Sequence, residues 1–253
     1  MSVDLHRRLL WSGGHLLASL LMAAAVAALV FFLWFPHPYR DLSGGIKLFL
    51  IIVGVDVVLG PFATMVVASA KKSMRELRMD IALIALLQMG ALGYGLWTVA
   101  QARPVYMAFE VDRFRVVHAV DVAPTLLALA PQEYRKLPMW GPRLIAVRPF
   151  VNNEEKMEVT MAALSGAIIG ARPDLWMPYD DSTPAVLAES KPVSDLLNRK
   201  PEYRAQIAGL IAGFQSSENS VRYLPVAGRD LFWTVVVNAN TAEPLGYLPV
   251  DPY

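Results

Sequence analysis

Three long apolar runs dominate the first 100 residues of the chain. They cover approximately residues 15–35, 46–68 and 80–100, and each is long enough to cross a bilayer, which takes about 20 apolar residues in a helix. The first run contains no charged residue and has four aromatic residues in its last five positions. A cleavable signal peptide has a shorter apolar region and ends in small residues, whereas aromatic side chains are typical of a membrane–water interface. The pattern therefore predicts three transmembrane helices.

Beyond residue 101 the apolar runs become short and the composition changes. Fifteen of the 18 prolines lie there, with 15 Lys/Arg and 17 Asp/Glu, against 8 and 5 in residues 1–100. We therefore divide the chain into a transmembrane domain, residues 1–101, and a second domain, residues 102–253. Strand-like and helix-like patterns alternate in the second domain, which predicts an α+β fold with a mixed, mainly antiparallel sheet and helices on one face. We expect two strands in 104–119 around a turn near Val111–Asp112, strands in 143–148, 231–238 and 244–250, a helix in 152–169, and one or two helices in 192–214.

Basic residues near the ends of the apolar runs indicate the orientation of the helices. Arg7 and Arg8 precede the first run, and the segment KKSMRELR, residues 71–78, separates the second run from the third. The segment 36–45, between the first two runs, carries only Arg40. Because Lys and Arg are enriched in cytoplasmic loops, we expect the N-terminus in the cytoplasm and the second domain on the opposite side of the membrane.

Few residues indicate catalysis or ligand binding. The sequence has no cysteine, which excludes disulfides and Cys-ligated metals. His118 is the only histidine of the second domain, and no nucleophile–base, phosphate-binding or metal-binding motif occurs. Asp180 and Asp181 indicate a turn or a helix cap, and the glutamates of residues 154–158 a solvated helix start. With 23 Lys/Arg against 22 Asp/Glu, a nucleic-acid surface is not expected. We expect no enzyme, no metal and no cofactor.

Asp56 is the most unusual residue of the apolar runs. A charged side chain near the centre of a bilayer costs about 2.5–3.5 kcal/mol on insertion scales, so it generally has a specific role. At a rise of 1.5 Å per residue, Asp56 and Gln88 lie roughly 15 and 18 Å from the outer ends of their helices, which is a similar depth in the membrane. Two interpretations stay open: the pair fastens two helices together by a hydrogen bond, or Asp56 contacts the helix of a client protein. A proton relay is disfavoured because no second titratable group lies at that depth.

Small residues recur at helical spacing on both of these helices. Asp56, Gly60 and Thr64 share one face of the second run, and Gln88 and Gly95 share one face of the third. Helix faces made of small residues permit close approach of helices in a membrane. Either the three helices pack on one another through these faces, or one face binds a transmembrane helix of another protein, and the five residues are our candidate binding residues.

The junction after the third run contains Arg103, Asp112 and Arg113. The arginine side chain is suited to bidentate contact with a carboxylate or a phosphate. We therefore expect Arg103 and Arg113 to anchor the second domain to the membrane surface or to acidic side chains, with Asp112 at the turn beside them.

Several segments resemble one family of membrane proteins. The segments are FPHPYRDLSGG, LFLIIVGVDVVLGP, KKSMRELRMDIALIALLQ, ARPVYMAFEVDRFRVV and NANTAEPLGYLPVD. From about residue 30 to the C-terminus, the chain resembles the TfpX/TfpZ family of type IV pilin accessory proteins. The resemblance implies a bacterial inner-membrane protein, and with the orientation expected from the basic residues its C-terminal domain is periplasmic. It also implies a partner, a type IV pilin, whose transmembrane helix and globular head are held before polymerisation. The alternative interpretation is a membrane-anchored ligand-binding sensor or transport component.

Overall fold

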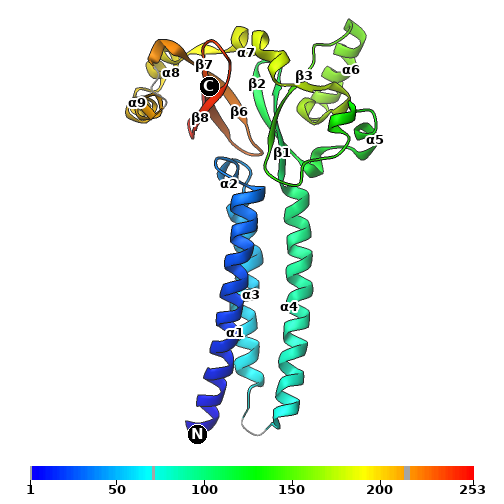
Figure 1. The fold of residues 1–253 in the computed structure, drawn as a ribbon, viewed down its shortest axis with the longest axis vertical. Coiled ribbons are helices and arrows are strands. Elements are labelled where there is room, and N and C mark those ends of the chain that lie inside the picture. Colours follow the sequence, from blue (N-terminus) through cyan, green and yellow to red (C-terminus); the bar gives the residue numbers. More distant parts are fainter. Residues whose placement is uncertain (1, 70–71, 214–216) are drawn as a thin grey trace.

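The protein consists of a long helical stalk that carries a sheet domain at one end (Figure 1). The computed structural model describes residues 2–69, 72–213 and 217–253. Within these ranges, three helices are long and apolar enough to cross a membrane, as the three apolar runs predicted. They are α1, Ser2–Ala28, which continues as the π-helical segment η1, Leu29–Trp34; α3, Gly45–Val67; and α4, Met74–Ala102.

Two stalk helices begin before the apolar runs do, α1 at Ser2 and α4 at Met74. The start of α4 is fixed by a capping box, in which Ser73 Oγ accepts the N–H of Glu76 and the Glu76 carboxylate accepts the N–H of Ser73. Hydropathy marks only the apolar part of a helix, whereas capping extends the backbone hydrogen bonding into its polar end. Of the basic residues used to orient the helices, Lys71 lies outside the described residues.

α3 is the central helix of the stalk, because it packs against both α1 and α4. Near the sheet domain the three helices share one apolar cluster, whose buried members are Val26, Val30, Trp34, Phe35, Leu92 and Val99. Toward the other end, Ser12 Oγ of α1 donates to the Pro61 carbonyl of α3 over 2.9 Å. An Arg7 guanidinium N–H donates to the Lys72 carbonyl over 3.3 Å, which brings the two predicted basic segments to the same end of the stalk.

The sheet domain, residues 104–253, is built on a mixed sheet that has eight strands in the described part of the chain. The strand order is β4-β3-β1-β2-β6-β7-β8, and β5 pairs with β6. The pairs β1–β3 and β2–β6 are parallel and the others antiparallel, which confirms the predicted sheet type. The strands are β1, Pro104–Glu110; β2, Arg113–His118; β3, Arg143–Val147; β4, Trp176–Pro178; β5, Lys191–Pro192; β6, Val221–Ala227; β7, Phe232–Asn238; and β8, Pro244–Leu248.

Helices cover both faces of this sheet, whereas we predicted helices on one face. Leu42 of α2 and Val186 of α7 belong to the apolar cluster on one face, while α8 and α9 contribute to a second cluster on the other face of β6 and β7. The fully buried β1 explains the difference, because every residue of that strand is buried and both of its faces need cover. The helices are α2, Tyr39–Leu42; α5, Pro124–Leu127; α6, Asn153–Leu164; α7, Thr183–Glu189; α8, Val193–Arg199; and α9, Arg204–Gly213.

The short elements β4, β5, α2, α5 and α7 were not predicted, and neither was the longer strand β6. It contains Pro225, and proline disfavours a strand because it has no N–H to donate. The structure accommodates this proline at the point where β6 changes its neighbouring strand. β6 pairs with β5 through Arg222 and Tyr223 and with β2 through Val226 and Ala227, so Pro225 lies between the two pairings.

The segment between α1 and α3 packs into the sheet domain. Tyr39 and Leu42 are buried in the cluster on the sheet, and the Tyr39 hydroxyl lies 3.6 Å from the Met107 sulfur. Burial, reinforced by the neighbouring Tyr247, raises the pKa of Tyr39. Gly228 is required for this contact, since a Cβ there would lie 2.5 Å from the Leu42 carbonyl oxygen. The division we placed at residue 101 therefore assigns to the stalk a segment that packs in the sheet domain. This segment connects stalk and domain at a second place, besides the junction between α4 and β1.

Candidate functional site

A hydrogen-bonded pair, Asp56 and Gln88, lies partway along the stalk between α3 and α4. Gln88 Nε2 donates to the Asp56 carboxylate oxygen Oδ1 over 2.8 Å and to the Asp56 main-chain carbonyl over 3.0 Å. Gln88 Oε1 is buried and accepts no hydrogen bond from the described residues. The structure thus brings together the two polar side chains that we placed at the same depth, and we call this pair the clamp.

Gly60 makes room for the clamp. A Cβ at this position would lie 2.2 Å from Gln88 Nε2, which is far inside van der Waals contact. Gly95 plays a similar part nearer the sheet domain, where a Cβ would lie 2.9 Å from Cγ1 of Ile52. Both glycines therefore set the distance between α3 and α4, in the way that small residues do in membrane helix pairs.

Thr64 faces a different helix from the other candidate residues. Its hydroxyl lies 2.6 Å from Nδ1 of His15 on α1, and its side chain is fully buried. Of the five candidates, Asp56, Gly60 and Gln88 therefore form one site, while Thr64 joins α3 to α1. His15 is a contact that the sequence did not indicate, because the helical spacing of α1 does not say which side chain of α3 it meets.

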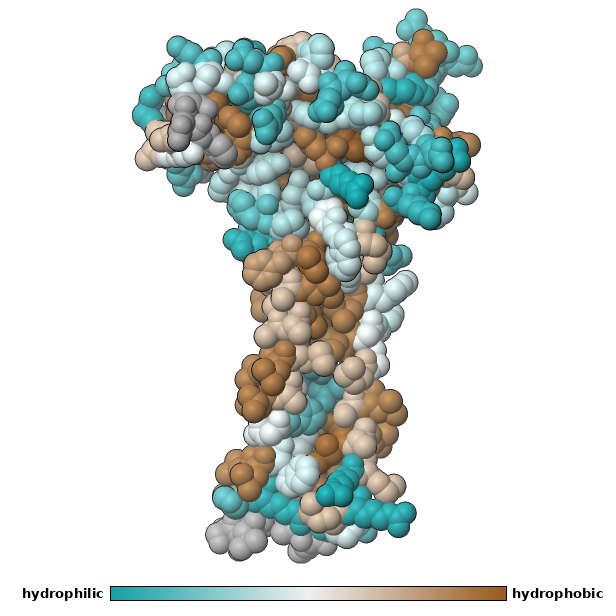
Figure 2. Space-filling view, in the orientation of Figure 1, coloured by the Kyte–Doolittle hydropathy of each residue, from teal (hydrophilic) through white to brown (hydrophobic). Residues whose placement is uncertain are grey.

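An apolar groove runs from the clamp along α3 and α4 toward the sheet domain. Its volume is about 290 Å³, and it is lined by Leu48, Ile51, Ile52, Val55, Asp56, Gln88, Ala91, Leu92, Tyr94, Gly95, Thr98 and Val99. The groove is open at the surface, since Ile51 is 60% and Tyr94 70% exposed. Figure 2 shows that this stalk is largely hydrophobic, with a hydrophilic area partway along it. An open apolar groove of this kind can accept lipid chains or an apolar helix.

The two junction arginines lie at opposite ends of the β1–β2 hairpin. Arg103 ends α4, and its guanidinium donates to the Ala100 carbonyl and, over 3.1 Å, to the Pro138 carbonyl. Arg113 lies beyond the two-residue turn of the hairpin, where its guanidinium contacts both carboxylate oxygens of Asp112 at 2.7 and 3.1 Å. Arg103 therefore joins the stalk to the sheet domain, whereas Arg113 and Asp112 lie at the other end of the hairpin, one strand length from that junction.

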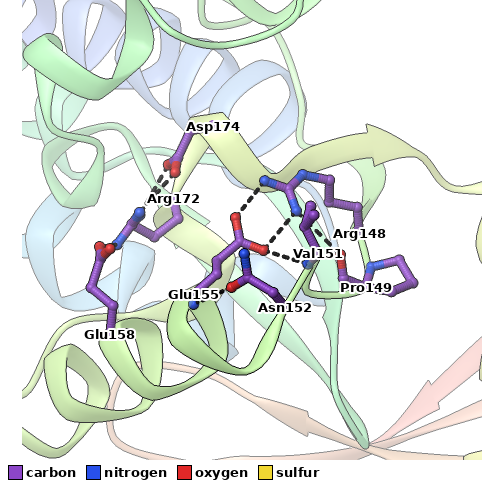
Figure 3. A network of polar contacts seen from close by, with 8 residues as sticks. All are labelled: Arg148, Pro149, Val151, Asn152, Glu155, Glu158, Arg172 and Asp174. Atoms are coloured by element: carbon purple, nitrogen blue, oxygen red, sulfur yellow. Dashed lines mark hydrogen bonds and ion pairs between the residues drawn. The ribbon is translucent and has the colours of Figure 1, made fainter.

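The sheet domain contains a polar network at the start of α6 that we did not predict (Figure 3). The Glu155 carboxylate accepts two hydrogen bonds from the Arg148 guanidinium, at 2.7 and 3.0 Å, and one from the N–H of Val151 at 2.7 Å. The Arg148 contact, followed by the Val151 N–H, lowers the pKa of Glu155 to about 2. Asn152 caps the helix by accepting the N–H of Glu155 over 2.8 Å.

A second arginine extends this network along α6. Arg172 donates to both carboxylate oxygens of Asp174, at 2.7 and 2.9 Å, and to Glu158 at 3.2 Å. These contacts raise the pKa of Arg172, with the Asp174 hydrogen bond as the main cause. Of the three glutamates that we interpreted as a solvated helix start, Glu155 and Glu158 therefore contact arginines, whereas Glu154 is exposed. The Asn152–Glu155 capping spacing was visible in the sequence, but the arginine partners come from segments that only the fold brings near.

α6 projects at the end of the sheet domain away from the stalk (Figure 1). It buries little of its own surface, and three of its apolar side chains are mostly exposed: Met157, Met161 and Leu164. The polar network thus fixes the base of an exposed helix. Among the described residues, no group of three or more His, Asp or Glu side chains could hold a metal ion.

Comparisons with known proteins point to one process. The family model of the fimbrial assembly protein FimB matches residues 3–44, which include α1, η1 and α2. The chain is 36% identical over 233 residues to the fimbrial assembly protein of serogroup I from Dichelobacter nodosus and 35% identical over 233 residues to that of serogroup E1, in each case over 90% of both chains. It is also 40% identical over 111 residues to the protein of serogroups C1 and C2, covering 44% of this chain and 85% of that one. No solved structure matches the chain.

Proposed function

Because this chain belongs to the fimbrial assembly protein family, we propose that it is a non-enzymatic accessory protein that holds a type IV fimbrial subunit before it enters the fimbrium. The family assignment supports a part in fimbrial biogenesis. The segments that resemble the TfpX/TfpZ pilin accessory proteins support the finer statement that the client is a type IV pilin. The geometry adds an apolar groove in the stalk that is open to such a client.

The protein spans the inner membrane with its N-terminus in the cytoplasm and its sheet domain in the periplasm. This orientation is supported by the basic residues Arg7, Arg8, Arg75 and Arg78 at the end of the stalk that is remote from the sheet domain. A reporter that is active only outside the cytoplasm tests it. Fused after Tyr253 the reporter is expected to be active, and fused after Arg75 inactive. The reverse pattern would overturn the orientation.

The groove receives the client's transmembrane helix, and the sheet domain contacts its globular head. Two weak contacts on one client give a higher effective affinity than either alone when the geometry lets both form together. The packing of Tyr39 and Leu42 into the sheet domain supports this mode, because it fixes the domain relative to the stalk at a second point besides the α4–β1 junction.

Co-purification tests the proposed partner. The full chain is purified after mild crosslinking of cells that assemble fimbriae, and the fimbrial subunit is expected in the crosslinked product. Cells that lack the subunit provide the control for nonspecific bands. A crosslinked product without the subunit, from cells in which the subunit is abundant, would contradict the proposal and favour a sensor or transport role.

A further inference from the structure

Two large apolar side chains of the sheet domain, Met139 and Trp140, are exposed close to the stalk. Each is 57% exposed, although the neighbouring Pro138 is buried. A tryptophan carries one of the largest apolar surfaces of any side chain, and its indole N–H is polar. Such a residue, exposed in a loop, suits a surface that is apolar on one side and polar on the other.

The position of this loop is fixed by the ends of two stalk helices. The N–H of Gly141 donates to the Leu33 carbonyl, at the end of η1, over 2.7 Å. On the other side, the Arg103 guanidinium at the end of α4 donates to the Pro138 carbonyl over 3.1 Å. The loop is therefore tied to the level at which both apolar helices end. If those helices span a membrane, this level is the membrane–water interface.

The charge of the loop fits a phospholipid surface. Residues 135–143, RKLPMWGPR, contain three basic residues and no acidic one. Arg135, Lys136 and Arg143 are all exposed. Tryptophan is enriched at membrane interfaces, and clustered Lys and Arg next to a membrane helix attract anionic lipid headgroups. The exposed tryptophan and the basic residues therefore lie in one short segment, at the level where the stalk helices end.

We propose that residues 135–143 form a lipid-binding loop, in which Met139 and Trp140 enter the interfacial layer of the membrane and the three basic residues contact anionic phosphate headgroups. The proposal rests on the proposed membrane span of the stalk. It gives the sheet domain an attachment to lipid in addition to its attachments to the stalk. The height and tilt of the domain above the membrane are then fixed.

Site-specific labelling tests this loop, because the chain contains no native cysteine to interfere. A fluorescent label is attached to Trp140→Cys in the full chain, reconstituted in vesicles of phosphatidylethanolamine and phosphatidylglycerol. Two exposed positions provide the controls. Leu164→Cys lies on α6, away from the stalk, where the native side chain is 77% exposed. Leu50→Cys lies within α3, where the native side chain is 60% exposed.

Phospholipids with brominated acyl chains are expected to quench the labels at positions 140 and 50, whereas aqueous iodide quenches the label at position 164. If position 50 is quenched by lipid and position 140 behaves like position 164, the lipid-binding loop is wrong while the membrane span stands. If position 50 is not quenched by lipid, the proposed membrane span itself fails. Replacing phosphatidylglycerol by neutral phosphatidylcholine is expected to weaken the quenching at position 140, and unchanged quenching would overturn the role of the basic residues.

Discussion

The clamp in the stalk and the polar network at α6 differ in how completely their hydrogen bonds are satisfied. In the stalk, Gln88 Nε2 makes both contacts of the clamp, and Gln88 Oε1 accepts nothing from the described residues. In the sheet domain, the Glu155 carboxylate accepts three hydrogen bonds, two of them from the charged Arg148. The network at α6 is therefore a saturated structural support. The clamp leaves one buried acceptor without a partner among the described residues, and it lies beside an open apolar groove.

The two sites also depend on different parts of their surroundings. The clamp exists because Gly60 lets α3 and α4 approach each other, so its stability is a matter of helix packing. The network at α6 exists because charges from two separate loops meet at a helix start, so its strength depends on ionisation. Steric changes are expected to break the clamp, whereas changes of charge or pH are expected to weaken the network at α6.

The largest effect is expected from Gly60→Ala. The added Cβ would lie 2.2 Å from Gln88 Nε2, so the clamp must break or the helices must separate. Overpacking of this kind typically destabilises by about 1–3 kcal/mol. Gly54→Ala on the same helix is the matched control, because nothing lies within 4 Å of a Cβ there. Unfolding in mixed micelles by SDS titration measures both variants, and equal stabilities would show that the glycine does not set the helix distance.

Replacing Asp56 separates packing from client contact. Asp56→Leu removes the side-chain acceptor of the clamp and is expected to destabilise the stalk by about 0.6–2 kcal/mol, the usual range for a polar contact between membrane helices. Asp56→Asn retains an oxygen acceptor and is expected to leave stability nearly unchanged. Protein level and fimbriation are measured for both variants. Loss of fimbriae in an abundant, folded Asp56→Asn protein would mean that the carboxylate itself contacts the client.

The stalk was largely predictable from the sequence because a helix has a fixed rise per residue. The depths of Asp56 and Gln88 followed from counting residues, and the hydrogen bond between them agrees with that count. The counting did not show which helix Thr64 faces, since that depends on how α1 lies against α3. It also did not show that Tyr39 and Leu42, in a short loop, pack into the core of the sheet domain.

The sheet domain was predictable only element by element. Local patterns gave the β1–β2 hairpin and its turn, whose Val111 has a φ of +55°. Strand β6 was missed because Pro225 is unfavourable in a strand, and only the arrangement of β5 and β2 makes it acceptable. The contact of Arg172 with Glu158, 14 residues away in the chain, likewise depends on how the segments fold together.

A smaller and local effect is expected from Glu155→Gln. Removing the charge weakens the Arg148 contact, so the amides of α6 are expected to exchange hydrogen faster. Because the folded-state pKa of about 2 lies below the ordinary value of 4.5, the native protein gains this support above about pH 4.5 and loses it as the pH falls toward 2. The difference between native protein and variant should shrink over the same range. Glu158→Gln is the control, since Glu158 is 68% exposed and makes one contact at 3.2 Å; an equally large effect there would argue against a special part for Glu155.

The smallest effect is expected from Arg113→Ala. Arg113 and Asp112 are adjacent and partly exposed, with side-chain exposures of 31% and 45%, and exposed ion pairs contribute at most about 1 kcal/mol. Arg103→Ala is expected to destabilise more, because it leaves the Pro138 carbonyl without its donor at the junction. Thermal unfolding in detergent compares the two variants. If both match the native protein in stability and fimbriation, the junction is only a linker.

Site-specific photo-crosslinking tests whether the groove beside the clamp holds the client's helix. A photoreactive amino acid is placed at Tyr94, which lines the groove, or at Leu86, which is on the same helix but outside the groove. The two native side chains are matched in exposure at 70% and 69%. In cells that assemble fimbriae, crosslinking to the fimbrial subunit is expected from position 94 and not from position 86. Subunit crosslinks from position 86 but none from position 94 would show that the client's helix does not lie in the groove.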